Sequence, residues 1–71
     1  MPLLETSRYE FRIAERLSAP ARAVFPELSV IEAPSGTVLF GAVRDDAELH
    51  GLLSRLHLLG LTILDVHRLP D

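Results

Sequence analysis

The sequence predicts a small α+β domain with a four-stranded antiparallel sheet and one main helix on one face of that sheet. Three observations support this fold class. Residues 9–17 alternate between apolar and polar side chains, which is the two-residue period of a half-buried strand. Residues 45–60 hold leucines at helical spacing between a helix-start and a helix-stop signal. Residues 28–33 and 37–44 are two short apolar runs joined by a tight turn, as in a β-hairpin.

The first expected strand spans residues 9–17, and its two sides differ in polarity. Residues 1–8 show no such period, so we expect a flexible N-terminus ahead of a single domain over residues 9–71. One side of the strand is apolar and the other is mostly polar: Tyr9, Phe11, Ile13 and Leu17 against Glu10, Arg12, Ala14 and Arg16.

Residues 18–26 begin with a helix-start signal. Ser18 is a good N-cap and Pro20 suits the first turn, whereas the proline at the end of the segment removes an amide donor and stops a helix. We expect Val24 and Phe25 to face inward. A helix of at most two turns and an irregular loop both fit this segment.

Residues 28–33 and 37–44 form the expected second and third strands, paired as an antiparallel hairpin. Between them, Pro34-Ser35-Gly36 is a turn in which the glycine can adopt a positive φ. Gly41 lies in the apolar row of the third strand. Its missing side chain is expected to let a helix approach the sheet.

The main helix is expected to begin after Asp45. This residue is a good N-cap, and Glu48 three residues later completes an acidic version of the capping box. Gly60 takes the left-handed position after the last turn, and residues 61–69 form the fourth strand. One stripe of the helix is apolar and is expected to face the sheet: Leu49, Leu52, Leu53, Leu56 and Leu59.

The expected order is therefore strand, short helix or loop, strand, strand, helix and strand. This order is that of the split βαβ, or ferredoxin-like, arrangement. In that arrangement the first and third strands are central, and the second and fourth strands are the edges of the sheet. If the first helix is missing, the chain reduces to a sheet with a single helix.

Length and composition favour self-association. A chain of 71 residues buries only about 60% of the surface that its unfolded form exposes. It has no Cys, so neither disulfides nor thiolate metal sites supplement the core. Because 48% of the residues are hydrophobic, a second copy is the natural place for surplus apolar surface. We expect a homo-oligomer, in the simplest case a dimer.

Charge and hydropathy exclude two classes of partner. The net charge is −3 and the arginines are scattered, so the chain lacks the clustered cations with which proteins neutralise nucleic-acid phosphates. No apolar run reaches the roughly 18–20 residues of a membrane span, and no targeting segment is visible. Together with the absence of Cys, these features are typical of a cytoplasmic protein.

The stretch TVLFGAVRDDAELHGLLSRLHLLGL, residues 37–61, resembles small actinobacterial proteins that have no assigned function. The resemblance implies an actinobacterial source and a strand–helix–strand unit, and it implies no activity. The expected architecture is also similar to that of ligand-sensing ACT domains. Residues 17–20 lack the glycine that the first loop of those domains carries, and the similarity is one of fold alone.

The sheet face opposite the helix is the most informative expected surface. In the expected registers Val38, Phe40 and Ile63 form an apolar patch there, rimmed by charged side chains. Such a patch on a small domain usually marks an interface, here with a second copy, another protein or a small ligand. The candidate binding residues are Arg12, Val38, Phe40, Ile63, Asp65 and His67.

The histidines do not predict a metal centre. His50 and His57 are about 10 Å apart along a helix, which is too far for two ligands that each lie roughly 2 Å from one zinc ion. Asp65 and His67 share one side of the last strand and could orient an imidazole, but we favour the interpretation that they belong to a solvated strand face. Ser54 lies one turn from both helical histidines, without an acid partner. We expect no catalytic residue, no metal and no cofactor.

Two functions from different classes fit the sequence. The first is a homo-oligomeric interaction or ligand-binding module without catalytic activity, which uses the open sheet face or an edge strand. The second is a small enzyme of the dimeric α+β barrel type, in which two sheets enclose a cavity. Arg12, Asp65 and His67 would be the polar groups of that cavity.

Overall fold

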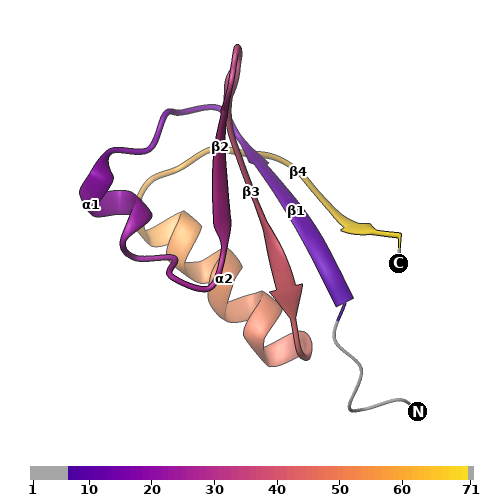
Figure 1. The fold of residues 1–71 in the computed structure, drawn as a ribbon. Coiled ribbons are helices and arrows are strands. Elements are labelled where there is room, and N and C mark those ends of the chain that lie inside the picture. Colours follow the sequence, from indigo (N-terminus) through magenta and orange to yellow (C-terminus); the bar gives the residue numbers. More distant parts are fainter. Residues whose placement is uncertain (1–6, 71) are drawn as a thin grey trace.

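A computed structural model describes residues 7–70. The four strands form one antiparallel sheet in the order β2-β3-β1-β4, so β3 and β1 are central and β2 and β4 are edges, as predicted. The main helix lies across one face of the sheet, and the short helix lies beside β2 (Figure 1). The elements are β1 (Ser7–Ile13), α1 (Ala19–Arg22), β2 (Ser29–Ala33), β3 (Gly36–Val43), α2 (Asp46–Leu58) and β4 (Ile63–Leu69).

β1 begins and ends earlier than the alternation of side chains predicted. Ser7 and Arg8 already pair with β3 and are part of β1, although we expected them in the flexible N-terminus. Residues 1–6 of that expected terminus, and residue 71, lie outside the described residues. Pairing with β3 ends at Ile13. Leu17 therefore lies beyond the strand, although it is buried as predicted.

The segment after β1 contains one helical turn. The hydroxyl oxygen of Ser18 accepts a hydrogen bond from the amide of Ala21 at 3.3 Å, which caps the turn as predicted. Phe25 is buried, but Val24 is exposed, contrary to the prediction that both face inward. With a single turn of helix, these neighbouring side chains point in different directions.

Gly41 permits a close approach to β3, but by a loop and not by a helix. A β-carbon at this position would lie 3.0 Å from the carbonyl oxygen of Glu27 and 2.9 Å from the side chain of Leu28. The chain between α1 and β2 therefore passes against β3 here. The contact brings Leu28 into the core, where it is buried.

α2 begins at the predicted capping residue. The Asp45 carboxylate accepts a hydrogen bond from the amide of Glu48 at 2.8 Å. The Glu48 carboxylate accepts one at 2.7 Å from the amide of Arg44, one residue before the donor of an ideal capping box. Gly60 follows the helix with a φ of 75°, as predicted.

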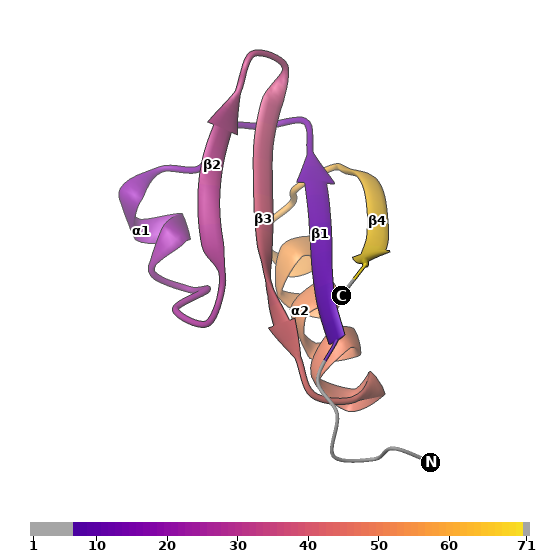
Figure 2. The same ribbon diagram turned by 45° about the vertical axis from the view of Figure 1, so that its right-hand side comes forward.

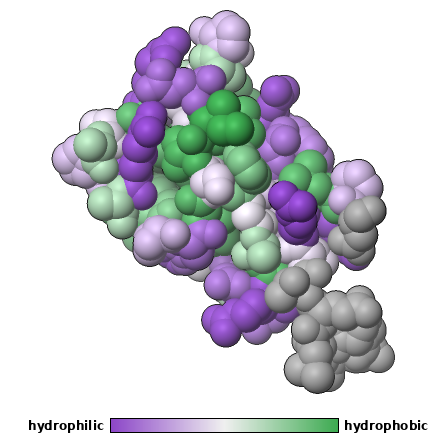
Figure 3. All heavy atoms as spheres, viewed as in Figure 1, coloured by the Kyte–Doolittle hydropathy of each residue, from purple (hydrophilic) through white to green (hydrophobic). Residues whose placement is uncertain are grey.

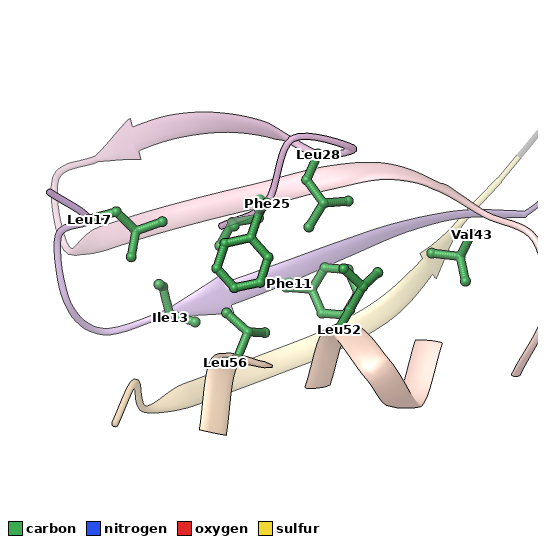
Figure 4. Packing of buried hydrophobic residues seen from close by; sticks show 9 residues of the cluster. Phe11, Ile13, Leu17, Phe25, Leu28, Val43, Leu52 and Leu56 are labelled. Carbon is green, nitrogen blue, oxygen red and sulfur yellow. The ribbon is translucent and has the colours of Figure 1, made fainter. Parts of the chain in front are cut away.

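The core lies between the sheet and α2, and the segment after α1 closes one end of it (Figure 4). Leu52 and Leu56 are fully buried, whereas Leu59 is 43% exposed and does not continue the predicted stripe inward. No helix among residues 7–70 is long and apolar enough to cross a membrane. The buried apolar residues are Phe11, Ile13, Leu17, Phe25, Leu28, Leu39, Val43, Leu52 and Leu56.

β4 contains a β-bulge that changes which of its side chains face the helix. Arg12 pairs with Asp65, but the next residue, Ile13, pairs with Ile63, so Leu64 is an extra residue on β4. Ile63 consequently packs against the core. Its predicted place in the apolar patch of the opposite face was wrong, and Leu64 is the residue that is 60% exposed.

Candidate functional site

The sheet face away from α2, here called the open face, has no helix over it among residues 7–70 (Figure 2). Phe11 and Leu39 are buried beneath α2, so the residues before and after them in their strands point to the open face. The strand registers bring together Ser29 and Ile31 of β2, Val38, Phe40 and Ala42 of β3, Arg8, Glu10 and Arg12 of β1, and Asp65, His67 and Leu69 of β4.

The half of the open face formed by β2 and β3 is apolar. Ile31 pairs with Val38 across the hairpin, and Phe40 follows Val38 on the same side of β3. Ile31 is 53% exposed, while Val38 and Phe40 are half-buried. Apolar side chains gather over this hairpin with hydrophilic ones around them (Figure 3). Leu64 of β4 lies across β1 from this hairpin and lines one small hollow together with Val38. We call the set Ile31, Val38, Phe40 and Leu64 the open-face patch.

The half formed by β1 and β4 is charged. Glu10 pairs with His67, and Arg12 pairs with Asp65. The Nδ1–H group of His67 donates a hydrogen bond to the Asp65 carboxylate at 2.7 Å, and His67 Nε2 lies 3.7 Å from the Glu10 carboxylate. Arg12 Nε lies 3.4 Å from that same carboxylate. The four side chains form one connected polar network on the surface.

The structure brings five of the predicted binding residues to the open face: Arg12, Val38, Phe40, Asp65 and His67. Their role in binding stays a prediction. Ile31 and Leu64 also lie on this face and were not among the predicted residues. Ile31 could have been found, because the Pro-Ser-Gly turn sets a register that places it opposite Val38. Leu64 had no local signal, since either of two adjacent apolar residues, 63 and 64, can face the core.

The geometry of the charged half supports contact better than catalysis. An imidazole held by a carboxylate can serve as a general base through its other nitrogen. In this chain that nitrogen faces Glu10, and the side chains of Asp65 and His67 are about half exposed. The adjoining pocket, lined by Arg12, Val38 and Leu64 among others, holds only about 130 Å³. Small-molecule sites usually span about 300–1,000 Å³.

A second hollow lies on the other face of the sheet, between α2 and β4. This α2–β4 groove is lined by Leu53, Ser54, His57, Leu58 and Ile63 and has a volume of about 470 Å³. Its surface is mostly apolar, and Leu58 is 83% exposed beside it. Within residues 7–70, no three His, Asp or Glu side chains are placed to hold one metal ion.

Comparison with known protein families yields a match. A protein-family model described as a domain of unknown function (DUF8691) matches residues 8–67. This match spans β1 to most of β4, including both halves of the open face. No curated protein and no solved structure was found to be similar to the chain.

Proposed function

The chain belongs to the family of the domain of unknown function DUF8691, and we propose that it is a small homo-oligomeric interaction module without catalytic activity. It associates through the open face of its sheet or through an edge strand. In this proposal the domain is ferredoxin-like, with its first helix reduced to the single turn of α1. The strand order and the crossing of α2 over one face support that relation.

The observation that carries the proposal is the open-face patch. Ile31 and Leu64 are each more than half exposed on a face that no helix among residues 7–70 covers. Exposed apolar surface of this kind, rimmed by charge, often marks an interaction site. Burying it stabilises the protein by about 25 cal/mol for each Å² of apolar area. This gain matters for a domain whose core, within residues 7–70, contains nine buried apolar residues.

The oligomeric state of purified chains tests this proposal. Size-exclusion chromatography with light scattering is expected to give the wild type at least twice the mass of one chain. Ile31→Glu and Phe40→Glu place a charge in the patch and are expected to lower that mass. Val24→Glu is the control, because Val24 is exposed on the α1 segment and lies outside the open face.

Two outcomes would count against the proposal. A wild type that stays monomeric at millimolar concentration excludes a homo-oligomeric module altogether. An oligomer that keeps its mass in both patch variants excludes the open face and leaves an edge strand as the contact. Circular dichroism of each variant shows whether a lower mass reflects lost contact or lost folding.

One observation favours a second candidate, the enzyme of the dimeric α+β barrel type. His67 bonds to Asp65 and faces Glu10, which is an arrangement suited to proton transfer when two stacked sheets enclose it. A crystal structure of the oligomer separates the candidates. A water-filled cavity lined by Arg12, Asp65 and His67 between two sheets favours the enzyme, whereas sheets that pack without a cavity exclude it.

A further inference from the structure

The two edges of the sheet are not equivalent. At β2, Glu32 accepts hydrogen bonds at 2.9 Å from both Arg16 and Arg22, and these ion pairs hold the α1 segment beside that edge. Neither β2 nor β4 pairs with a further strand of residues 7–70 on its outer side, but β4, unlike β2, has no α1 segment beside it. An edge strand with free backbone donors and acceptors is a template for another strand.

Three antiparallel registers between β4 and a second copy of β4 are centred on its middle residues, and they differ in which side chains face each other. Residues that oppose each other in a continuous sheet must point to the same face. In a register centred on Asp65, Asp65 of one copy faces Asp65 of the other. In a register centred on His67, the two His67 residues face each other. A register centred on Val66 instead places Asp65 opposite the partner's His67, twice by symmetry.

We infer that β4 pairs antiparallel with β4 of a second copy in the register centred on Val66, which joins two four-stranded sheets into one of eight strands. The inference rests on the proposed homo-oligomeric function and names one contact that builds the oligomer. Asp65 and His67 already lie within hydrogen-bond distance inside one chain. The same two groups therefore meet again across the joined edge, where a hydrogen bond between facing side chains stabilises the pair.

The α2–β4 groove fits the same partner. A two-fold axis perpendicular to the joined sheet keeps both α2 helices on one side of it. The groove lies between α2 and this edge, so the exposed Leu58 and the half-buried Ile63 of both copies lie on that side and near the junction. The β-bulge at Leu64 precedes the paired residues and Pro70 follows β4, so both lie outside the charged pairs.

A charge-swap experiment tests the register. Asp65→Lys alone places a cation opposite the partner's histidine, and His67→Asp alone places two aspartates opposite each other. Each lone variant is expected to associate about tenfold more weakly than the wild type. In an equimolar mixture each facing pair again contains one carboxylate, opposite either the new lysine or the histidine, and the mixture is expected to regain the wild-type mass by light scattering. His50→Asp, on the exposed side of α2, is the control and is expected to keep the wild-type mass.

The outcomes separate this inference from the proposed function. Lone variants that lose mass and a mixture that regains it support β4 pairing, and the recovery itself shows that both variants fold. Lone variants that keep the wild-type mass, or a mixture that stays at the lower mass, overturn the β4 register while an oligomeric wild type leaves the proposed function standing. A monomeric wild type overturns both.

Discussion

At the scale of single residues, Arg55 connects α2 to the segment that follows α1. Its guanidinium donates two hydrogen bonds to the Glu27 carboxylate, at 2.7 and 3.2 Å, and one to the carbonyl oxygen of Val24 at 2.8 Å. It also lies over the ring of Phe25, 5.6 Å from its centre. Hydrogen bonds from Arg55 lower the pKa of Glu27, and the same bonds raise the pKa of Arg55.

This ion pair makes stability depend on pH in a defined direction. Because the pKa of Glu27 is lower in the folded chain than its ordinary value of 4.5, the stabilisation is complete above that value and is lost as the pH falls through the folded value. Glu27→Gln is expected to lower the free energy of unfolding by about 0.5–1 kcal/mol at neutral pH, since both partners are partly exposed. The loss is expected to vanish in acid, as measured by urea unfolding.

A double-mutant cycle provides the control. In the Arg55→Ala background, Glu27→Gln has no guanidinium to lose and is expected to leave the free energy of unfolding almost unchanged. An equal loss in both backgrounds would show that Glu27 acts through some other group.

Glu15 performs a related role near the other end of the fold. Its carboxylate accepts hydrogen bonds from the amide of Thr62 at 2.8 Å and from the Thr62 hydroxyl at 2.7 Å. These bonds, first the one from the hydroxyl, lower the pKa of Glu15. They tie the chain after β1 to the turn before β4, so acid is expected to loosen this connection in the same direction as the one at Glu27.

At the scale of elements, the end of α2 is a Schellman motif. The amide of Gly60 donates to the carbonyl of His57 at 2.9 Å, and the amide of Leu61 donates to the carbonyl of Leu56 at 3.1 Å. Gly60 permits both bonds because it adopts a φ of 75°, a conformation that side chains disfavour. The motif turns the chain from α2 into β4 and so helps to set where β4 begins.

Two glycines of this region are expected to respond oppositely to the same substitution. Gly60→Ala is expected to lower the free energy of unfolding by about 1–2 kcal/mol, because alanine is strained at positive φ. Gly51→Ala, inside α2 with open space around it, is expected to raise it by about 0.5–1 kcal/mol through helix propensity. Thermal unfolding followed by circular dichroism measures both, and a destabilising Gly51→Ala would contradict the open surroundings of that position.

At the scale of the whole molecule, α2 covers one face of the sheet, and no other helix of residues 7–70 covers the opposite face. Within this described part of the chain the core contains nine buried apolar side chains, while Ile31, Leu58 and Leu64 are each more than half exposed. Apolar surface thus appears on the open face and beside the β4 edge. This distribution is the reason for proposing association through a face or an edge and, specifically, through β4.

Substitutions of two leucines of α2, one buried and one exposed, test which residues of the helix belong to the core. Leu56→Ala is expected to lower the free energy of unfolding by about 2–5 kcal/mol, because Leu56 is fully buried. Leu58→Ala, two residues later and 83% exposed, is expected to change it by less than about 0.5 kcal/mol. Urea unfolding of chains diluted below their association range measures the difference. A similar loss in both variants would mean that Leu58 is covered within a single chain.

The features that the sequence predicted well depend on neighbours along the chain. Asp45 and Gly60 bound α2 through hydrogen bonds within a few residues of themselves, and Ser18 caps its turn in the same way. The alternation of apolar residues likewise identified which side chains of β1 face α2. Element types, central strands and most of the open face follow from such local patterns and from short connections.

What the tertiary structure alone decided depends on contacts between distant segments. The β-bulge at Leu64 reflects how β4 pairs with β1, about fifty residues earlier in the chain. Because of the bulge, Ile63 faces the core and Leu64 is exposed instead. Gly41 is met by a loop because α1 is too short to cover β3. The sequence by itself determined the caps, the strands and the charged residues of β4, because backbone hydrogen bonding and side-chain alternation are local. Only the packed fold decided which apolar side chains face solvent and which edge of the sheet lies beside the α1 segment, because these depend on how much of the sheet one helix and one helical turn can cover.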